Sequence, residues 1–138
     1  MHDHDTYDYA IIRVVPKVER EEFVNVGVIV SCPAREFLEA RIELDESRLM
    51  AIDPTLDVEI VRAHLASLLA VCAGGKPAGP IGRLSQRERF RWLVAPRSTI
   101  IQTSPVHAGC ARDLVAVLEH LLDRMVRPSR AASPAAPP

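Results

Sequence analysis

The sequence predicts a single α+β domain, with a mainly antiparallel sheet of about four strands packed against three helices. Two apolar, β-branched runs near the start are joined by a short charged link, as in antiparallel strand pairs. Apolar residues recur at helical spacing in three later segments. The chain has 138 residues, of which 48% are hydrophobic and 25% charged, which is typical of one globular domain.

The first predicted strand covers residues 7–15 and ends at Pro16, which cannot donate a ladder hydrogen bond. A charged connection or short helical turn follows over residues 17–22. The second strand covers residues 23–32 and is apolar at both even and odd positions, which predicts a strand covered on both faces. Gly27 in its interior indicates a bulge or a close backbone approach.

Residues 37–44 alternate between apolar and charged, as in a strand with one solvated face. A short helical turn is expected over residues 45–51. The first long helix, over residues 57–73, places its apolar side chains on one stripe and ends at a Gly-Gly pair. Four glycines and two prolines within residues 74–82 predict a loop.

A second helix is expected from Ser85, which begins a capping box with Glu88, to about residue 95. Residues 98–104 form the late fourth strand, and the third helix covers about residues 110–126. The domain is therefore expected to span residues 6–127. Residues 1–5 and the Pro/Ala/Ser-rich residues 128–138 are expected to be disordered.

Charge and cysteine content restrict the class of protein. Residues 1–75 hold 14 acidic and 7 basic side chains, whereas residues 76–138 hold 4 acidic and 10 basic ones. This asymmetry indicates either a phosphate-binding face or two halves that pack against each other. The three cysteines lack metal-ligand spacing, so we expect small buried hydrophobes in a reducing cytosol. No secretion signal or apolar run of membrane-spanning length occurs in the sequence, and no metal or cofactor is expected.

Five polar residues form the candidate ligand site, because they lie within or beside apolar strands: Arg13, Glu22, Asn25, Arg97 and His107. An arginine fork could hold a phosphate or a carboxylate of a ligand. The structural alternative is that Arg13 pairs with Glu19 or Glu22 across the hairpin. His107 with Arg97 would be the minimum for acid–base chemistry, but no acid that could orient the imidazole lies nearby in sequence.

The densest basic cluster extends from residue 83 to residue 97. Arg83, Arg87 and Arg91 would share one helical face if the helix began early enough, and they are the candidate phosphate-binding residues. Trp92 beside them could stack on a base. The alternative is an ordinary solvated helix face with the aromatic side chains turned to the core.

Several motifs are similar to those of a family of small bacterial proteins of unknown function, DUF3037. The resemblance covers nearly the whole chain apart from the termini and rests on the following segments: residues 7–10, 13–16, 22–28, 40–45, 72–75, 89–97 and 103–107. Such families are often encoded beside a HipA-like kinase, so the resemblance implies an accessory or partner role and no assigned reaction.

The sequence therefore favours a bacterial, cytoplasmic, non-enzymatic binding or accessory module that acts with a partner protein, possibly a HipA-like kinase. One alternative is a nucleic-acid or nucleotide-phosphate binding protein that uses Arg13 and the Arg83–Arg97 cluster. The other is a small phosphotransferase or hydrolase built around Arg97 and His107. No residue is assigned a catalytic role.

Overall fold

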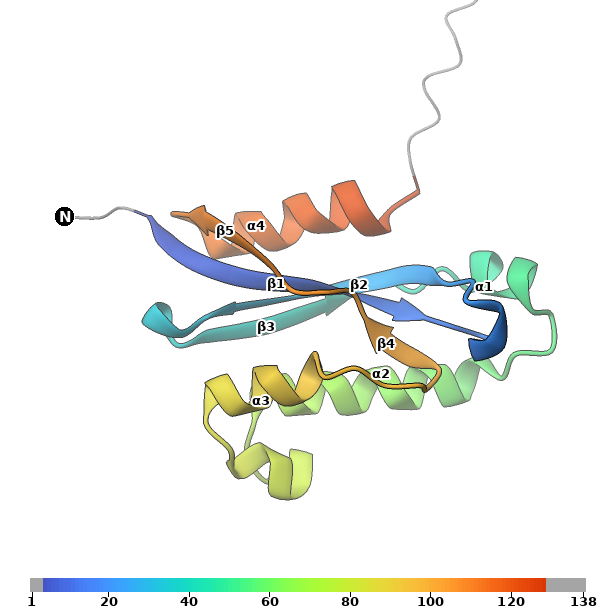
Figure 1. The fold of residues 1–138 in the computed structure, drawn as a ribbon, viewed down its shortest axis with the longest axis horizontal. Coiled ribbons are helices and arrows are strands. Elements are labelled where there is room, and N and C mark those ends of the chain that lie inside the picture. Colours follow the sequence, from blue (N-terminus) through green and yellow to red (C-terminus); the bar gives the residue numbers. More distant parts are fainter. Residues whose placement is uncertain (1–3, 129–138) are drawn as a thin grey trace, which may run out of the picture.

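The computed structural model describes residues 4–128 and shows an antiparallel sheet between two layers of helices (Figure 1). The sheet order is β3-β2-β1-β4, and β5 pairs with β1 beyond β4 on the same edge. The strands are β1 (Asp5–Val14), β2 (Val24–Cys32), β3 (Phe37–Ile42), β4 (Ile101–Thr103) and β5 (His107–Ala111). The predicted α+β class is confirmed, with one more strand than expected.

The helical elements are α1 (Glu46–Ile52), α2 (Val58–Ala73), α3 (Gln86–Leu93) and α4 (Leu114–Leu121), which continues as the π-helical turn η4 (Leu122–Val126). Short 3-10 turns occur at η1 (Val18–Arg20), η2 (Pro33–Arg35) and η3 (Lys76–Arg83). Residues 74–82 are therefore more regular than the predicted loop, although Gly79 breaks the turn with a φ of 66°.

Side-chain caps decide where the helices begin. Asp57 accepts from two backbone N–H groups at the start of α2, and Asp113 accepts from Ala116 at the start of α4. At the start of α3, the capping box between Ser85 and Glu88 is complete, as the sequence predicts.

The two helical layers bury two separate apolar clusters. α2 and α3 lie under one face of the sheet, and α4 lies over the other, as Figure 1 shows. On the α2 side, Val61 and Leu65 pack with Ile12 and Val14 of β1. On the α4 side, Leu118 is fully buried with residues of β1 and β2. The strand predicted to be covered on both faces, β2, is indeed buried on both.

A bulge divides the pairing of β1 with β2. Ile12 pairs with Gly27, but Arg13 pairs with Asn25, so Val26 is an extra residue on β2. The bulge reverses the face of the following side chains: Val26 packs on the α2 side and Val28 on the α4 side. The bulge thus lies next to Gly27, where the sequence indicates a bulge or a close backbone approach.

The strand β5 was not expected, because residues 107–111 hold small residues with little strand preference. It forms because β1 offers a free edge and begins at Asp5, two residues earlier than expected, so residue 5 belongs to the sheet. Ser104 lies between β4 and β5 and is bound to β1: its hydroxyl accepts from the Ile11 N–H at 2.8 Å. The last helix consequently begins at Leu114 rather than near residue 110.

The expected disorder of residues 1–3 and 129–138 lies outside the described residues. Within residues 4–128, no single helix is long and apolar enough to cross a membrane. Only α2 and η3 taken together reach that length and composition, and they are bent by 59°.

Candidate functional site

Arg13 lies at the bulge of the sheet, directly opposite Asn25 of β2. Its guanidinium group stacks on the ring of Phe23, with 4.0 Å between the central carbon and the ring centroid. Asn25 donates from Nδ2 to the carbonyl of Met125 in η4 at 3.0 Å, which fixes the orientation of the amide. Bulges and π-helical turns are both frequent beside functional sites, and here they meet at one residue pair.

Two buried side-chain atoms at this point have no hydrogen-bond partner among residues 4–128. They are Nε of Arg13 and Oδ1 of Asn25. Arg13 also forms no ion pair with a carboxylate of the described residues. Because an unpaired buried polar atom costs about 1–3 kcal/mol, such atoms are uncommon in a region with a purely structural role.

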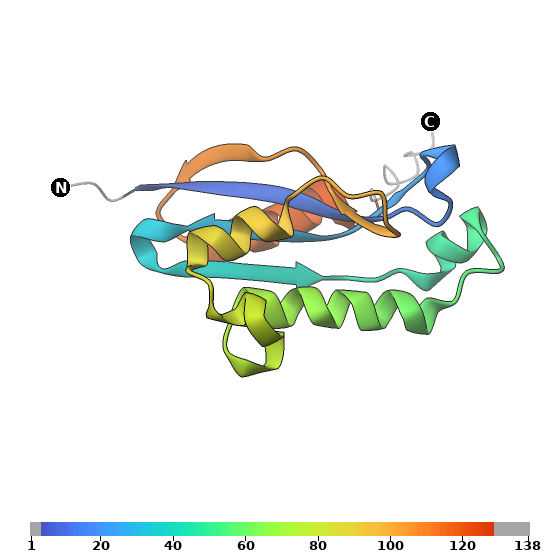
Figure 2. The same ribbon diagram turned by 60° about the horizontal axis from the view of Figure 1, so that its bottom comes forward.

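Arg97 approaches Arg13 from another part of the chain. It follows α3, donates to the carbonyl of Trp92 and stacks on the indole ring at 4.1 Å. Figures 1 and 2 place the β1–β2 connection and the segment before β4 at the same end of the sheet. There Arg13 and Arg97 line one pocket of about 330 Å³, which is completed by Val15, Val18, Glu21, Phe23, Ser98 and Gln102. We call this the two-arginine pocket.

Positive charge dominates the two-arginine pocket. Burial lowers the pKa of both Arg13 and Arg97, but a guanidinium group ordinarily titrates so far above neutral pH that both side chains stay charged. The one carboxylate among the lining residues, that of Glu21, is exposed and forms no ion pair with either arginine. The pocket is thus suited to an anionic group that accepts hydrogen bonds from two guanidinium edges.

The other candidate ligand residues lie elsewhere. Glu22 pairs with Arg20 at 2.5 Å, and Arg13 forms no ion pair with Glu19 or Glu22, so the expected structural alternative is wrong. His107, on the edge strand β5, is exposed and stacks on Tyr9, with ring centroids 5.4 Å apart. Neither Asn25 nor His107 lines the two-arginine pocket. The structure therefore brings together two of the five candidate residues in one cavity.

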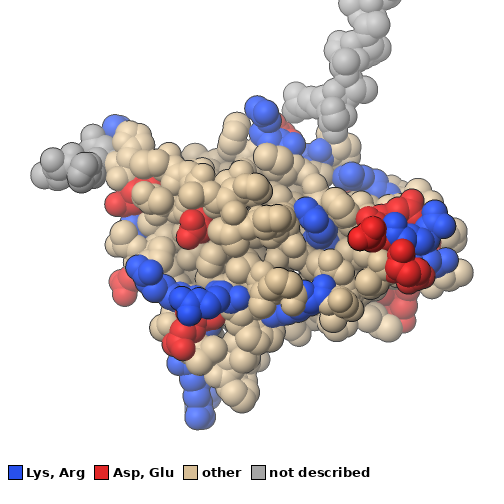
Figure 3. Space-filling model, in the orientation of Figure 1, with Lys and Arg blue, Asp and Glu red and all other residues tan. Residues whose placement is uncertain are grey.

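The basic cluster is divided by the start of α3. Arg87 and Arg91 lie four residues apart on α3 and are exposed, whereas Arg83 precedes the Ser85 cap and is not part of that helix. Figure 3 shows a row of basic surface over α3 and the segment after it. Arg87 and Arg91 also line a smaller pocket of about 230 Å³ beside Asp8.

Arg89 belongs to the basic cluster in sequence but has a structural role. Its side chain turns inward and donates to the carbonyls of Val71, Cys72 and Leu84, at 2.8–3.2 Å. It thereby supplies hydrogen-bond donors to carbonyl groups in the last turn of α2, which have no donor partner farther along the helix. This arginine is unavailable for phosphate binding.

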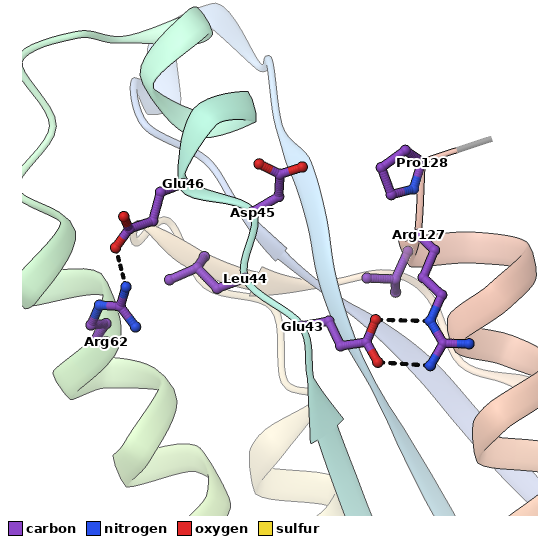
Figure 4. Close-up of a pocket in the computed structure, with 8 residues that line it drawn as sticks. Glu43, Leu44, Asp45, Glu46, Arg62, Arg127 and Pro128 are labelled. Carbon is purple, nitrogen blue, oxygen red and sulfur yellow. Dashed lines mark hydrogen bonds and ion pairs between the residues drawn. The ribbon is translucent and has the colours of Figure 1, made fainter. Parts of the chain in front are cut away.

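A larger cavity, of about 660 Å³, lies where β3, α1 and η4 meet (Figure 4). Its charges pair with one another: Arg127 forms two 2.8 Å hydrogen bonds to Glu43, and Arg62 pairs with Glu46. Asp45 accepts from Ser47 and caps α1. We interpret this cavity as structural, because no arginine or glutamate that lines it lacks a partner.

The Arg127 network predicts a pH dependence of stability. Arg127 lowers the pKa of Glu43 and of Glu119 from their usual 4.5, mainly through hydrogen bonds. A carboxylate with a lowered pKa in the folded state adds stability above pH 4.5, which is lost as the pH falls through the folded pKa. We expect Arg127→Gln to lower the melting temperature at pH 6–7, and the difference from the wild type to shrink towards pH 3.

The control is Arg20→Gln, which removes an ion pair between residues only two positions apart. Its effect on the melting temperature should be small at every pH. A difference between Arg127→Gln and the wild type that stayed constant from pH 7 to pH 3 would contradict this role.

Sequence reasoning missed three features of the two-arginine pocket: the contributions of Glu21 and Gln102, and the stacking of Arg13 on Phe23. Phe23 and Arg13 share no pattern in sequence, and the pairing of Arg13 with Asn25 places Phe23 beside Arg13. The cysteine prediction is also partly wrong. Cys32 and Cys72 are buried, but Cys110 is exposed on the edge strand. Burial raises the pKa of the Cys72 thiol to about 12.

No three His, Cys, Asp or Glu side chains within residues 4–128 are grouped as a metal site requires. The fold and the pocket define an α+β protein with a helix-covered antiparallel sheet and an arginine-lined cavity at its end. The chain belongs to the family described as "Protein of unknown function (DUF3037)", whose model matches residues 9–126. No curated protein and no solved structure matches it significantly.

Proposed function

We propose that the protein is a non-enzymatic binding module whose two-arginine pocket receives an anionic group of its ligand. The observation that carries this proposal is the state of Arg13, a half-buried arginine with no ion-pair partner among the described residues. Such a charge is costly to desolvate unless something compensates it. An anion that bridges Arg13 and Arg97 would supply that compensation.

The lining of the pocket favours binding over catalysis. It contains arginine, serine, glutamine, one exposed glutamate and apolar side chains, and no histidine or cysteine is among its described lining residues. The phosphotransferase or hydrolase alternative needs His107 beside Arg97, but His107 stacks on Tyr9 and does not line the pocket. A positioned acid–base pair is therefore missing from this cavity.

Calorimetric titration with inorganic phosphate at low ionic strength tests the proposal. We expect saturable binding to the wild type and a loss of at least about tenfold in affinity for Arg13→Gln and for Arg97→Gln, equal to about 1.4 kcal/mol each. Arg20→Gln is the matched control, because Arg20 lies near the pocket but pairs with Glu22. Binding that is unchanged in both pocket variants would overturn the proposal.

The nucleic-acid alternative has its own support in Arg87 and Arg91, which are exposed on one helix. A single-stranded oligonucleotide held by these side chains and by Arg97 should bind with a steep salt dependence. This alternative would replace the anion-binding proposal if the affinity for oligonucleotides rose with their length and fell in Arg87→Gln and Arg91→Gln.

A partner protein, such as the HipA-like kinase that the family resemblance implies, and a bacterial cytoplasmic setting belong to the same proposal. In support, Val18 and Phe23 line the pocket with 38% and 43% of their surface exposed, which offers apolar contact area to a partner. The buried thiols of Cys32 and Cys72 suit a reducing compartment. Pulldown from the native host with wild-type protein and Phe23→Ser would test the partner.

A further inference from the structure

The two-arginine pocket also carries information about the chemistry of its ligand. Each guanidinium group is held against a ring, Arg13 on Phe23 and Arg97 on Trp92, so their orientations are restrained before any ligand arrives. Arg97 uses one Nη atom on the Trp92 carbonyl, which leaves its other N–H groups to bind. Preorganised guanidinium forks match the oxygens of a phosphate, and two of them match a group with two negative charges.

The remaining polar atoms of the pocket are suited to hydroxyl groups. Gln102, which pairs with Arg13 in the β1–β4 ladder, donates from Nε2 to the Thr99 carbonyl at 2.9 Å. Its amide is thus oriented, and Oε1 remains as an acceptor. Glu21 adds a carboxylate that can accept a hydrogen bond from a hydroxyl group but repels a second phosphate. The pocket therefore combines two donors for an anion with two acceptors for neutral O–H groups.

Size sets an upper limit on the ligand. A volume of about 330 Å³ is at the lower end of the range for small-molecule sites. The stacking faces of Phe23 and Trp92 that bear Arg13 and Arg97 are already occupied, so these faces cannot also stack on a nucleobase. This geometry disfavours ligands that depend on base stacking.

Resting on the proposed function, we infer that the ligand of the two-arginine pocket is a small phosphomonoester that carries hydroxyl groups, such as a sugar phosphate. The phosphate bridges Arg13 and Arg97, and a hydroxyl group donates to Oε1 of Gln102. A single carboxylate carries one charge and two oxygens, and a dicarboxylate such as succinate separates its two charges, so either satisfies the two guanidinium groups less completely than one phosphate.

Four probes separate the parts of this inference in calorimetric titrations: ribose 5-phosphate, inorganic phosphate, ribose and succinate. We expect ribose 5-phosphate to bind at least about tenfold more tightly than phosphate or succinate, and ribose alone to show no saturation. Gln102→Leu should bring the affinity for ribose 5-phosphate down to that for phosphate, while it leaves phosphate binding within about twofold.

Gln86→Leu is the matched control, because Gln86 is also half-buried and also donates to a backbone carbonyl, that of Phe37, but lies outside the pocket. It should leave all four affinities unchanged. Circular dichroism melts of both variants establish that each is folded before titration.

The outcomes distinguish this inference from the proposed function. If succinate bound as tightly as ribose 5-phosphate and both depended on Arg13, the anion pocket would stand and the phosphomonoester would be wrong. If Gln102→Leu did not weaken ribose 5-phosphate relative to phosphate, the hydroxyl contact would be wrong. If no anion bound at all, the proposed function and this inference would both fail.

Discussion

Replacing Gly27 by valine is expected to lower the free energy of unfolding by about 3 kcal/mol, the upper end of typical overpacking penalties. A Cβ atom at Gly27 would lie 2.5 Å from the carbonyl oxygen of Arg41 and 2.9 Å from Cδ1 of Ile42. The first of these is backbone of the neighbouring strand β3, so no rotamer change can relieve the contact. Since domains of this size are stable by only about 5–15 kcal/mol, urea unfolding will detect the loss readily.

Ala108→Val is the control for Gly27→Val, because it also adds a β-branched side chain to a strand but at an exposed position of β5. Its effect should stay within about 0.5 kcal/mol. Equal midpoints of urea unfolding for Gly27→Val and the wild type would mean that β2 and β3 are not in close contact at the bulge.

The second large effect is expected for Arg89→Met, which should cost about 3 kcal/mol of unfolding free energy. The substitution keeps most of the apolar stem but removes the donors to the carbonyls of Val71, Cys72 and Leu84. These carbonyls at the end of α2 would lose charge-assisted hydrogen bonds, and at least part of their desolvation cost would remain.

Arg87→Met tests the same chemical change two positions earlier in α3, where the side chain is exposed. It should change the free energy of unfolding by less than about 0.5 kcal/mol. If the two variants were equally stable, Arg89 would not hold the end of α2, and the inward orientation of its side chain would be wrong.

The sequence predicts the elements that local chemistry determines. The caps at Asp57 and Ser85 sit directly before amphipathic stripes, so the starts of α2 and α3 were correctly placed within one or two residues. The strands β1 and β2 were predictable from their β-branched runs. In each of these cases, residues that are close in sequence supply the decisive interactions.

Features that depend on distant partners could not be predicted. Residues 107–111 become β5 only because β1 extends to Asp5 and leaves an edge to pair with. The bulge at Val26 depends on the pairing register, although Gly27 gave a correct indication of it. These features follow from tertiary pairing rather than from strand propensity.

The candidate site could be predicted only in part, because its pocket also depends on residues that are distant in sequence. Arg13 was recognisable as a charge within an apolar strand, and Arg97 as a member of a basic cluster. Their shared pocket depends on the path of the chain from α3 into β4, which no local pattern encodes. His107 is a candidate on its chemistry alone, and the register of β5 places it beside Tyr9 instead.

The most direct test of the two-arginine pocket is a phosphate titration followed by NMR of the arginine Nε–H resonances. We expect those of Arg13 and Arg97 to shift together along one saturation curve, because one anion contacts both guanidinium groups. The resonance of Arg20, which pairs with Glu22, should stay in place. Resonances of Arg13 and Arg97 that did not move at saturating phosphate would contradict the account.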